Sequence, residues 1–240
     1  MKFKGLAISL LAACGFSAQA QATPINGTAL QGVLDNITVG GPSSIDVQTD
    51  QMLVDERWSI TGAGGSIATI VIELAGYANG TSFGIYDVSS PSNYVEIMSG
   101  AAGSGDQAVV SIKADGSVFV NFADSGVDFA QNLFGYYLNV SATGNRFYSE
   151  ADLNGDGVDH LVAFQGTNTD TVQLPGLAPG LWTNNEYVLA FEDLWGGGDR
   201  DYTDFVAMVE SVTPVPEPGT LALLGLGLAG LAGVRRKRRA

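Results

Sequence analysis

The chain has 240 residues, a high glycine count of 32 and a low charged fraction of 15%, which is typical of a loop-rich β protein. It carries 25 acidic and 11 basic side chains, for a formal net charge of −14, with a single His and a single Cys. These counts exclude a structural zinc site built from His and Cys, a disulfide framework and a c-type haem attachment site.

Residues 1–20 have the parts of a secretory signal peptide: two lysines, an apolar stretch and small residues before a cleavage site. We expect signal peptidase to recognise Ala18 and Ala20 and to cut after Ala20. An alternative is a bacterial lipobox ending at Cys14, which would then be lipidated. A permanent membrane helix is disfavoured because the apolar stretch is too short.

Residues 21–213 are expected to form one β-rich domain. A short helix is predicted over residues 28–36, with Thr28 as its N-cap and two glycines after its end. Runs rich in Val, Ile, Phe and Tyr between turn-forming residues predict strands at residues 44–48, 67–75, 82–87, 94–98, 107–113, 117–122, 133–141, 159–165, 187–192 and 205–212. Residues 114–117 have the composition of a hairpin turn. Many short strands without long amphipathic helices predict an all-β fold, a single jelly-roll-like β-sandwich.

A first acidic loop follows at residues 152–160. Side-chain oxygens at its first, third and fifth positions, then a glycine at the sixth, match the first half of an EF-hand calcium loop. The candidate ligands are Asp152, Asn154, Asp156, the carbonyl of Val158, and Asp159. The match ends at His160, and Ala163 stands where an EF-hand has its bidentate Glu. The alternative is a turn stabilised by its own Asn and Asp side chains.

A second acidic loop, at residues 192–204, holds five carboxylates and one arginine. Its three consecutive glycines let the backbone fold back, and carboxylates brought so close would repel one another without a cation. The candidate ligands are Glu192, Asp193, Asp199, Asp201 and Asp204. Calcium is the expected ion for both loops. The alternative is an exposed acidic loop with one ion pair made by Arg200.

Residues 214–240 consist of a Pro-rich segment, an apolar stretch at 221–234 and an arginine-rich end. At ~1.5 Å per residue the apolar stretch is about 21 Å long, short of a ~30 Å hydrocarbon core. The basic end should stay cytoplasmic. These parts, in this order, resemble the PEP-CTERM sorting signal, in which Pro216, Glu217 and Pro218 would be the recognition element.

This resemblance implies export from a Gram-negative bacterium that makes exopolysaccharide. It also implies that exosortase, a membrane protease, recognises the motif. Contact with the membrane would then be limited to the transient span at residues 221–234. A permanent single-span anchor is the alternative.

Without both ends, residues 21–213 keep four basic and 24 acidic side chains, a net charge near −20 that argues against nucleic-acid binding. From about residue 147 to 212 the sequence resembles the domain-of-unknown-function 4114 family. The matching pieces are residues 147–149, 152–157, 159–164, 191–194 and 197–204, with Thr203 in place of the family's usual Asn. The resemblance implies an exported β domain with an acidic, calcium-binding site, and it implies no reaction.

We therefore expect a structural or adhesive protein of the cell surface or exopolysaccharide matrix, stiffened by calcium. The alternative is a lectin-like module that binds exopolysaccharide through Trp182 and Trp195, although such side chains more often fill the end of a sandwich. Catalysis is not expected, because no nucleophile motif is evident. His160, the sole histidine, is expected to hydrogen-bond the acidic loops rather than act as a general base.

Overall fold

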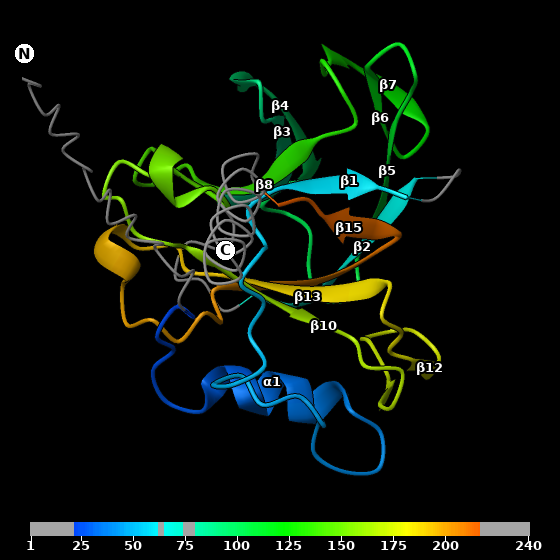
Figure 1. Cartoon of the computed structure of the whole chain (residues 1–240), viewed down its shortest axis with the longest axis vertical. Coiled ribbons are helices and arrows are strands. Elements are labelled where there is room, and N and C mark those ends of the chain that lie inside the picture. The colour runs from blue at the N-terminus through cyan, green and yellow to red at the C-terminus, as the bar shows by residue number, and fades with distance from the viewer. Residues whose placement is uncertain (1–21, 62–64, 74–79, 217–240) are drawn as a thin grey trace, which may run out of the picture.

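The computed structural model describes residues 22–61, 65–73 and 80–216 (Figure 1). The predicted signal peptide at 1–20 and the predicted span at 221–234 lie outside the described residues. Among the residues that are described, no helix is long and apolar enough to cross a membrane.

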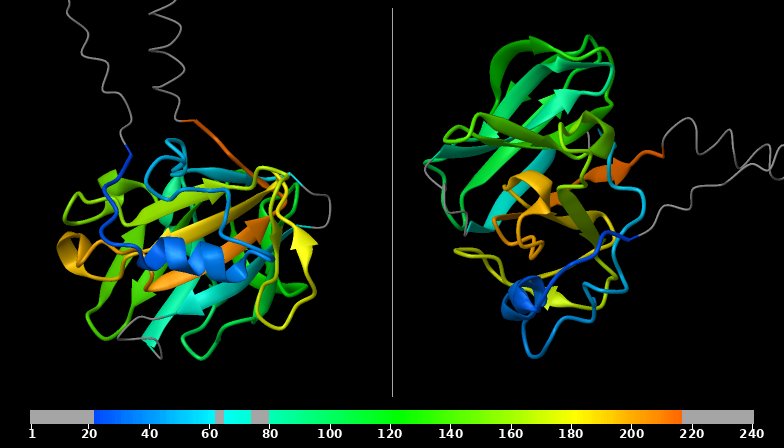
Figure 2. Two further views of the ribbon diagram at one scale, coloured as in Figure 1. Left: turned by 90° about the horizontal axis from the view of Figure 1, so that it is seen from below. Right: turned by 90° about the vertical axis from the view of Figure 1, so that its left-hand side faces the viewer.

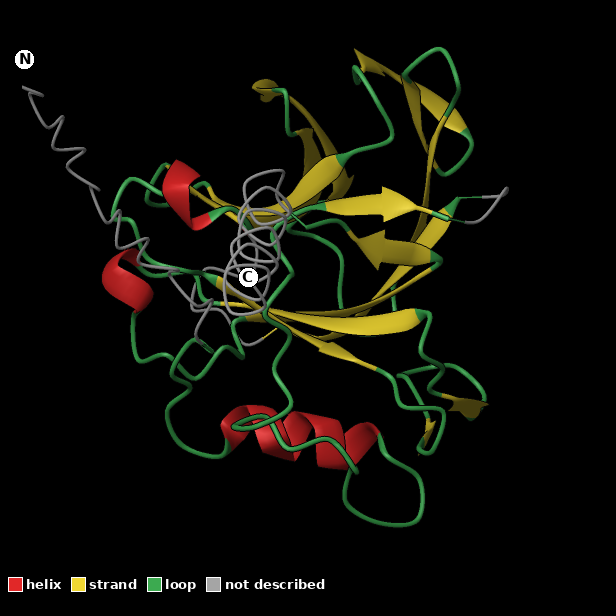
Figure 3. Ribbon diagram, in the orientation of Figure 1, coloured by secondary structure: helices red, strands yellow, loops and turns green. Residues whose placement is uncertain are grey.

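The described chain folds into two large antiparallel sheets, coloured yellow in Figure 3. The six-stranded sheet has the order β15-β1-β8-β3-β4, with β9 also paired to β8, and the seven-stranded sheet has the order β10-β13-β14-β2-β5-β6-β7. The short strands β11 and β12 pair separately. The elements are α1 (Ala29–Ile37), β1 (Trp58–Ile60), β2 (Ser66–Glu73), β3 (Thr81–Asp87), β4 (Ser90–Met98), β5 (Gln107–Ile112), β6 (Ser117–Val120), β7 (Ala123–Asp128), β8 (Phe134–Val140), β9 (Asn145–Tyr148), η2 (Ala151–Leu153), β10 (Leu161–Gln165), β11 (Thr171–Val172), β12 (Gly180–Leu181), β13 (Glu186–Phe191), η3 (Trp195–Gly197), β14 (Phe205–Glu210) and β15 (Val212–Pro214).

An aromatic core fills the space between the two large sheets. The ring of Phe83 stacks on Phe205 at 4.9 Å and on Tyr136 at 5.4 Å, and Trp58 meets Tyr187 edge-on at 5.0 Å. These side chains are almost completely buried, and each contributes roughly 1.5–3 kcal/mol through removal of apolar surface from water. The chain is therefore an all-β sandwich, as the sequence predicts.

A second apolar layer lies on the outer face of the seven-stranded sheet, where α1 packs (Figure 2). The buried face of the helix, including Leu30 and Leu34, meets Val162 and Phe164 of β10. Because β10, β13 and β14 are covered on both faces, nearly every side chain in them is apolar and buried. These three strands form the rigid base from which the acidic loops extend.

The predicted helix at residues 28–36 corresponds to α1, but Thr28 makes no side-chain capping hydrogen bond. At the other end, Thr38 closes the helix by donating its hydroxyl to the carbonyl of Leu34 at 2.8 Å. Helix formation thus rests on the apolar stripe rather than on the expected cap.

The strand predicted at residues 44–48 is not formed. Its alternating Ile45 and Val47 are buried, but side chains occupy the backbone donors that a ladder would use. The N–H of Asp46 donates to Asp50 at 2.9 Å, and the N–H of Val47 donates to Gln31 at 3.0 Å. Side-chain acceptors therefore replace a neighbouring strand.

The two acidic loops meet because the strands that carry them are neighbours. The first loop leads into β10, the second leaves β13, and Leu161 at the start of β10 pairs with Phe191 at the end of β13. Both loops therefore lie at one end of the sandwich, where η2 and η3 are found (Figure 1, left).

Candidate metal centre

The loop between β13 and β14 has a strongly curled backbone. Gly196, Gly197 and Gly198 all have positive φ, as do Arg200 and Tyr202 at 61° and 53°. Glycine adopts this conformation freely, whereas each non-glycine residue in it costs of order 1 kcal/mol and needs support from its surroundings. The curl turns the carboxylates of the loop towards one another, as the glycine run predicts.

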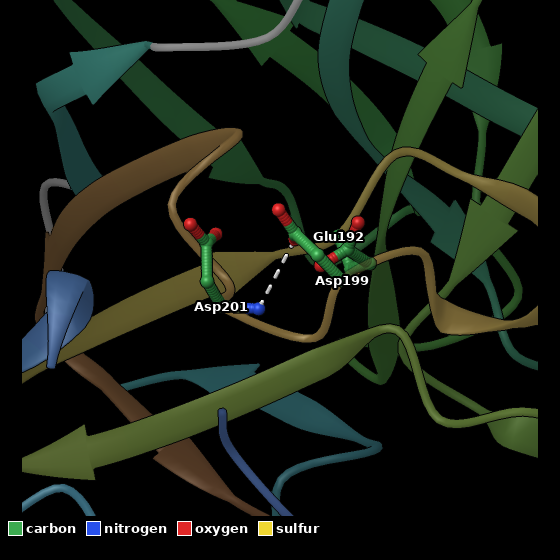
Figure 4. Close-up of side chains that lie close together, drawn as sticks. All are labelled: Glu192, Asp199 and Asp201. Carbon is green, nitrogen blue, oxygen red and sulfur yellow. Dashed lines mark hydrogen bonds between the residues drawn. The ribbon is translucent and has the colours of Figure 1, made fainter. Parts of the chain in front are cut away.

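Two overlapping groups of carboxylates result, and Glu192 belongs to both. Oxygens of Glu192, Asp199 and Asp201 lie within 4.8 Å of one another, and so do oxygens of Glu192, Asp193 and Asp204. Figure 4 shows the first group, with Glu192 and Asp199 close together and the backbone N–H of Asp201 donating to Asp199 at 3.4 Å. Two oxygens bound to one calcium ion are at most about 5 Å apart, so both groups fit the ion.

The inner carboxylates of this centre, Glu192 and Asp193, are buried, and three of their four oxygens lack a hydrogen-bond donor in the described part of the chain. Glu192 and Asp193 are only 1% and 2% exposed. Among the described residues, neither oxygen of Glu192 nor Oδ2 of Asp193 has a hydrogen-bond partner. Buried carboxylates are normally paired or metal-bound, since an uncompensated charge in the interior is costly.

The pKa values of these carboxylates also show that their negative charge is uncompensated. Burial, followed by the charge of Asp204, raises the pKa of Glu192 to about 9 and the pKa of Asp193 to about 7. Burial also raises the pKa of Asp204. Without a cation, the cluster therefore holds protons that acidic side chains ordinarily lose well below neutral pH.

The first acidic loop is arranged differently from an EF-hand. Asn154 is buried and pairs with backbone, its Oδ1 accepting from the N–H of Tyr148 at 2.7 Å. Its Nδ2 donates to the carbonyls of Tyr148 at 3.0 Å and Val158 at 2.8 Å. Asp152 is exposed on η2. Gly157 has φ of 66°, as the predicted sharp turn requires.

Asp156 joins the two loops instead of standing apart with an ion. Its Oδ2 accepts from the backbone N–H of Gly196 at 2.7 Å and lies 3.0 Å from Nε2 of His160. Nδ1 of His160 lies 2.9 Å from the carbonyl of Glu192. Burial raises the pKa of Asp156, but the hydrogen bonds from Gly196 and His160 outweigh it and hold that pKa below its usual value.

The histidine is therefore a positioning residue for the centre, as expected. It is fully buried, and its ring stacks on Phe147 at 3.9 Å. From there it spans Asp156 of the first loop and the backbone of Glu192 in the second.

Asp159 faces a partner that sequence reasoning did not find. Burial and then the carboxylate of Asp159 raise the pKa of Asp55 well above its ordinary value. Asp159 itself accepts from the hydroxyl of Thr23 at 2.5 Å, and its carbonyl accepts from Tyr202 at 2.8 Å. Nothing in the local sequence of Asp55 marks it, because the contact joins segments about a hundred positions apart.

An N-terminal strap, residues 23–26, also crosses both loops. Beyond the contact of Thr23 with Asp159, the N–H of Asn26 donates to the carbonyl of Arg200 at 2.8 Å. The side-chain amide of Asn26 donates to the carbonyl of Asp199 at 2.7 Å. The strap thus fixes the backbone of two residues beside the carboxylate cluster.

The structure brings the predicted ligands of the second loop together but not those of the first loop. Within the described chain, the groups with ligand spacing contain only second-loop residues: Glu192, Asp193, Asp199, Asp201 and Asp204. The first-loop carboxylates of Asp152, Asp156 and Asp159 belong to neither group, and those of Asp156 and Asp159 accept from backbone N–H groups. The remaining candidates, Asn154 and the carbonyl of Val158, are hydrogen-bonded to each other. The all-oxygen, mostly carboxylate donor set of the second loop suits calcium.

Comparison with known families gives two matches. The family described as "Domain of unknown function (DUF4114)" matches residues 103–212, and the "PEP-CTERM protein-sorting motif" matches residues 214–239. The first match begins well before residue 147, so it also takes in β5 to β9. No curated protein and no solved structure matches the chain significantly.

The matched region does not complete either large sheet. β2 lies outside the match and yet is placed between β14 and β5. β1, β3 and β4, which precede the matched region, make up half of the six-stranded sheet. The fold around the acidic centre therefore also depends on residues upstream of the matched region.

Proposed function

Because the chain carries a DUF4114 domain followed by a PEP-CTERM sorting motif, we propose that it is an exported structural or adhesive protein whose β13–β14 loop binds calcium. The sorting motif implies processing by exosortase, export, and C-terminal anchoring in a Gram-negative envelope. The calcium site and the matrix role are proposals that go beyond what the sorting motif implies. The observation that carries them is the buried carboxylate pair of Glu192 and Asp193, in which three of the four oxygens lack a hydrogen-bond partner among the described residues.

A solvated acidic loop does not account for this geometry. Charges repelling in water would turn outward, whereas Glu192 and Asp193 point into the protein beside Asp204. Within the described residues, no ion pair includes any of these three carboxylates. A bound cation is the simplest group that would supply the missing charge.

Calcium fits this centre better than magnesium. Calcium accepts six to eight oxygens in flexible geometry, which a curled loop with five carboxylates can provide. Magnesium requires near-ideal octahedral geometry and keeps several of its waters. The oxygen set gives no soft ligand for zinc or copper, since the one histidine is already bonded at both ring nitrogens.

Binding would stiffen the end of the sandwich. The ion would join the end of β13 to the segment before β14, through Glu192 and Asp204. His160 and Asp156 extend this connection to the first loop, and Asn26 extends it to the N-terminal strap. We infer that the ion locks these segments into one rigid surface, as suits a component of the exopolysaccharide matrix.

Thermal unfolding in chelator, calcium and magnesium tests the proposal. Extracellular calcium modules have dissociation constants on the order of 10⁻⁴–10⁻³ M, and ligand at about 100 times that constant adds about 2.7 kcal/mol. We expect calcium to raise the melting temperature by several degrees and magnesium to raise it little. Asp193→Asn should lose most of the calcium effect, while Asp128→Asn, an exposed site on β7, should keep it. Equal shifts in both variants would contradict the assignment.

A further inference from the structure

The tips of the two acidic loops expose large apolar side chains. Trp195 is 59% exposed on η3, next to Leu194 at 43%, while Leu153 is 37% exposed on η2. The other two tryptophans, Trp58 and Trp182, are completely buried. Trp182 is thus a core residue, and Trp195 is the tryptophan in the described chain that faces solvent. Solvent-facing tryptophan at a loop tip is a common anchor for ligands.

The ring of Trp195 is held in place across the gap between the loops. A Cβ added at Gly155 of the first loop would lie 2.8 Å from Cη2 of the indole, so the ring rests directly on the Gly155 backbone. The next residue, Gly196, is tied by its N–H to Asp156 at 2.7 Å. A fixed ring loses little conformational entropy when a ligand stacks on it.

The exposed groups on these two loops limit what the ring can bind. Asp152 and Asp199 are exposed on the same two loops, and carboxylates accept hydrogen bonds but donate none. The net charge of residues 21–213, near −20, repels phosphate, anionic lipid and acidic polymers. A neutral sugar complements this surface in two ways. Its hydroxyl groups can donate to the carboxylates, and the apolar face of its ring can stack on the indole.

We propose that Trp195, with Leu153 and Leu194 exposed on the same two loops, is a stacking platform for pyranose units of a neutral polysaccharide, with Asp152 and Asp199 as acceptors for sugar hydroxyls. The platform uses the loops of the proposed calcium site and so deepens the proposed matrix role. Apart from Asp199, its contact side chains nevertheless differ from the proposed calcium ligands of the second loop.

Affinity electrophoresis of the full protein through gels with hydroxyethyl cellulose, galactomannan or xylan tests the platform. We expect at least one of these polymers to retard the protein, and Trp195→Ala to weaken the affinity about tenfold or more. Trp195→Phe should retain part of it. Phe122→Ala provides the matched control, since Phe122 is 82% exposed on the remote β6–β7 turn. It should leave the retardation unchanged.

Gly155→Ala gives a second, subtler test. The backbone at Gly155 is not in the left-handed region, so alanine is tolerated there, but its methyl group would push the indole aside. We expect retardation to fall while the protein stays folded. Absence of retardation on all three polymers, equal loss in Trp195→Ala and Phe122→Ala, or binding to phosphatidylcholine vesicles instead would overturn the proposal.

The calcium melt separates this proposal from the one on which it rests. Trp195→Ala should keep the full calcium-dependent shift, because the indole supplies no ligand. If calcium has no effect and wild-type retardation persists in chelator, the metal site fails and the platform stands. If calcium stabilises the protein and no polymer retards it, the platform fails alone.

Discussion

Replacing Glu192 by Gln should stabilise the metal-free protein and abolish its response to calcium. In the metal-free state, Glu192 is 1% exposed without a hydrogen-bond donor, and its pKa of about 9 reflects burial and the nearby Asp204. The side-chain amide introduced by the substitution is neutral and can donate to a neighbouring carboxylate. At pH 7 the wild-type carboxyl must take up a proton in order to fold, whereas the amide needs none, so we expect a gain of about 1–3 kcal/mol in the free energy of unfolding.

In calcium, the same substitution should have the opposite effect. Glu192 belongs to both carboxylate groups, so a neutral amide at this position weakens every arrangement of the ion. Stability gained in chelator and lost in calcium is the signature of a ligand, since a purely structural side chain would shift both states in the same direction.

Chemical denaturation in chelator and in millimolar calcium measures both effects. For a domain of this size, each kcal/mol corresponds to about 2–4 °C in melting temperature, so thermal melts can confirm the result. Asp128→Asn is the control for loss of one exposed carboxylate. The reasoning is refuted if Glu192→Gln destabilises the chelated protein, or if it keeps the calcium shift of the wild type.

Other changes test the surroundings of the centre. Because the raised pKa values of Glu192 and Asp193 favour the protonated forms on folding, the stability that these two groups contribute in chelator should be greatest below the ordinary pKa of about 4.3. It should fall as pH rises through about 7 and 9, and calcium should flatten this profile in denaturation experiments. Gly198→Ala places a methyl group against Glu192 and should remove the calcium shift in melts, whereas Gly126→Ala, also at positive φ but in open space, should only cost about 1 kcal/mol. Glu217→Ala in the sorting motif should leave the unprocessed precursor in membrane fractions on immunoblots, and normal release would contradict the assigned motif.

The sandwich could be predicted because strand composition and turn chemistry agree along most of the chain. Strand segments such as residues 82–87 and 187–192 closely match β3 and β13. The strands β1, β9, β11, β12 and β15 could not be predicted, since two to four residues carry little periodic signal, and β7, with the sequence ADSGVD, lacks apolar alternation. Their pairing depends on distant partners, as with Trp58 and Pro214.

The acidic centre could be predicted in part for a similar reason. The glycine run and the acids around it lie in one loop, so local sequence predicts that Asp199 and Asp201 converge with Glu192. The role of Asn154 could not be predicted, because its side-chain amide hydrogen-bonds to the backbone of Tyr148, which lies outside the loop. The contribution of Asn26 was hidden by separation along the chain.

Isothermal titration of calcium in two buffers of different ionisation enthalpy, at about pH 7, tests the central claim most directly. Since the pKa of Glu192 is about 9 without metal, a bound ion must displace a proton from the cluster. We predict calcium binding with a dissociation constant on the order of 10⁻⁴–10⁻³ M, release of at least about one proton, and much weaker binding of magnesium. The absence of any heat of calcium binding at millimolar calcium, or binding without proton release, would contradict the account.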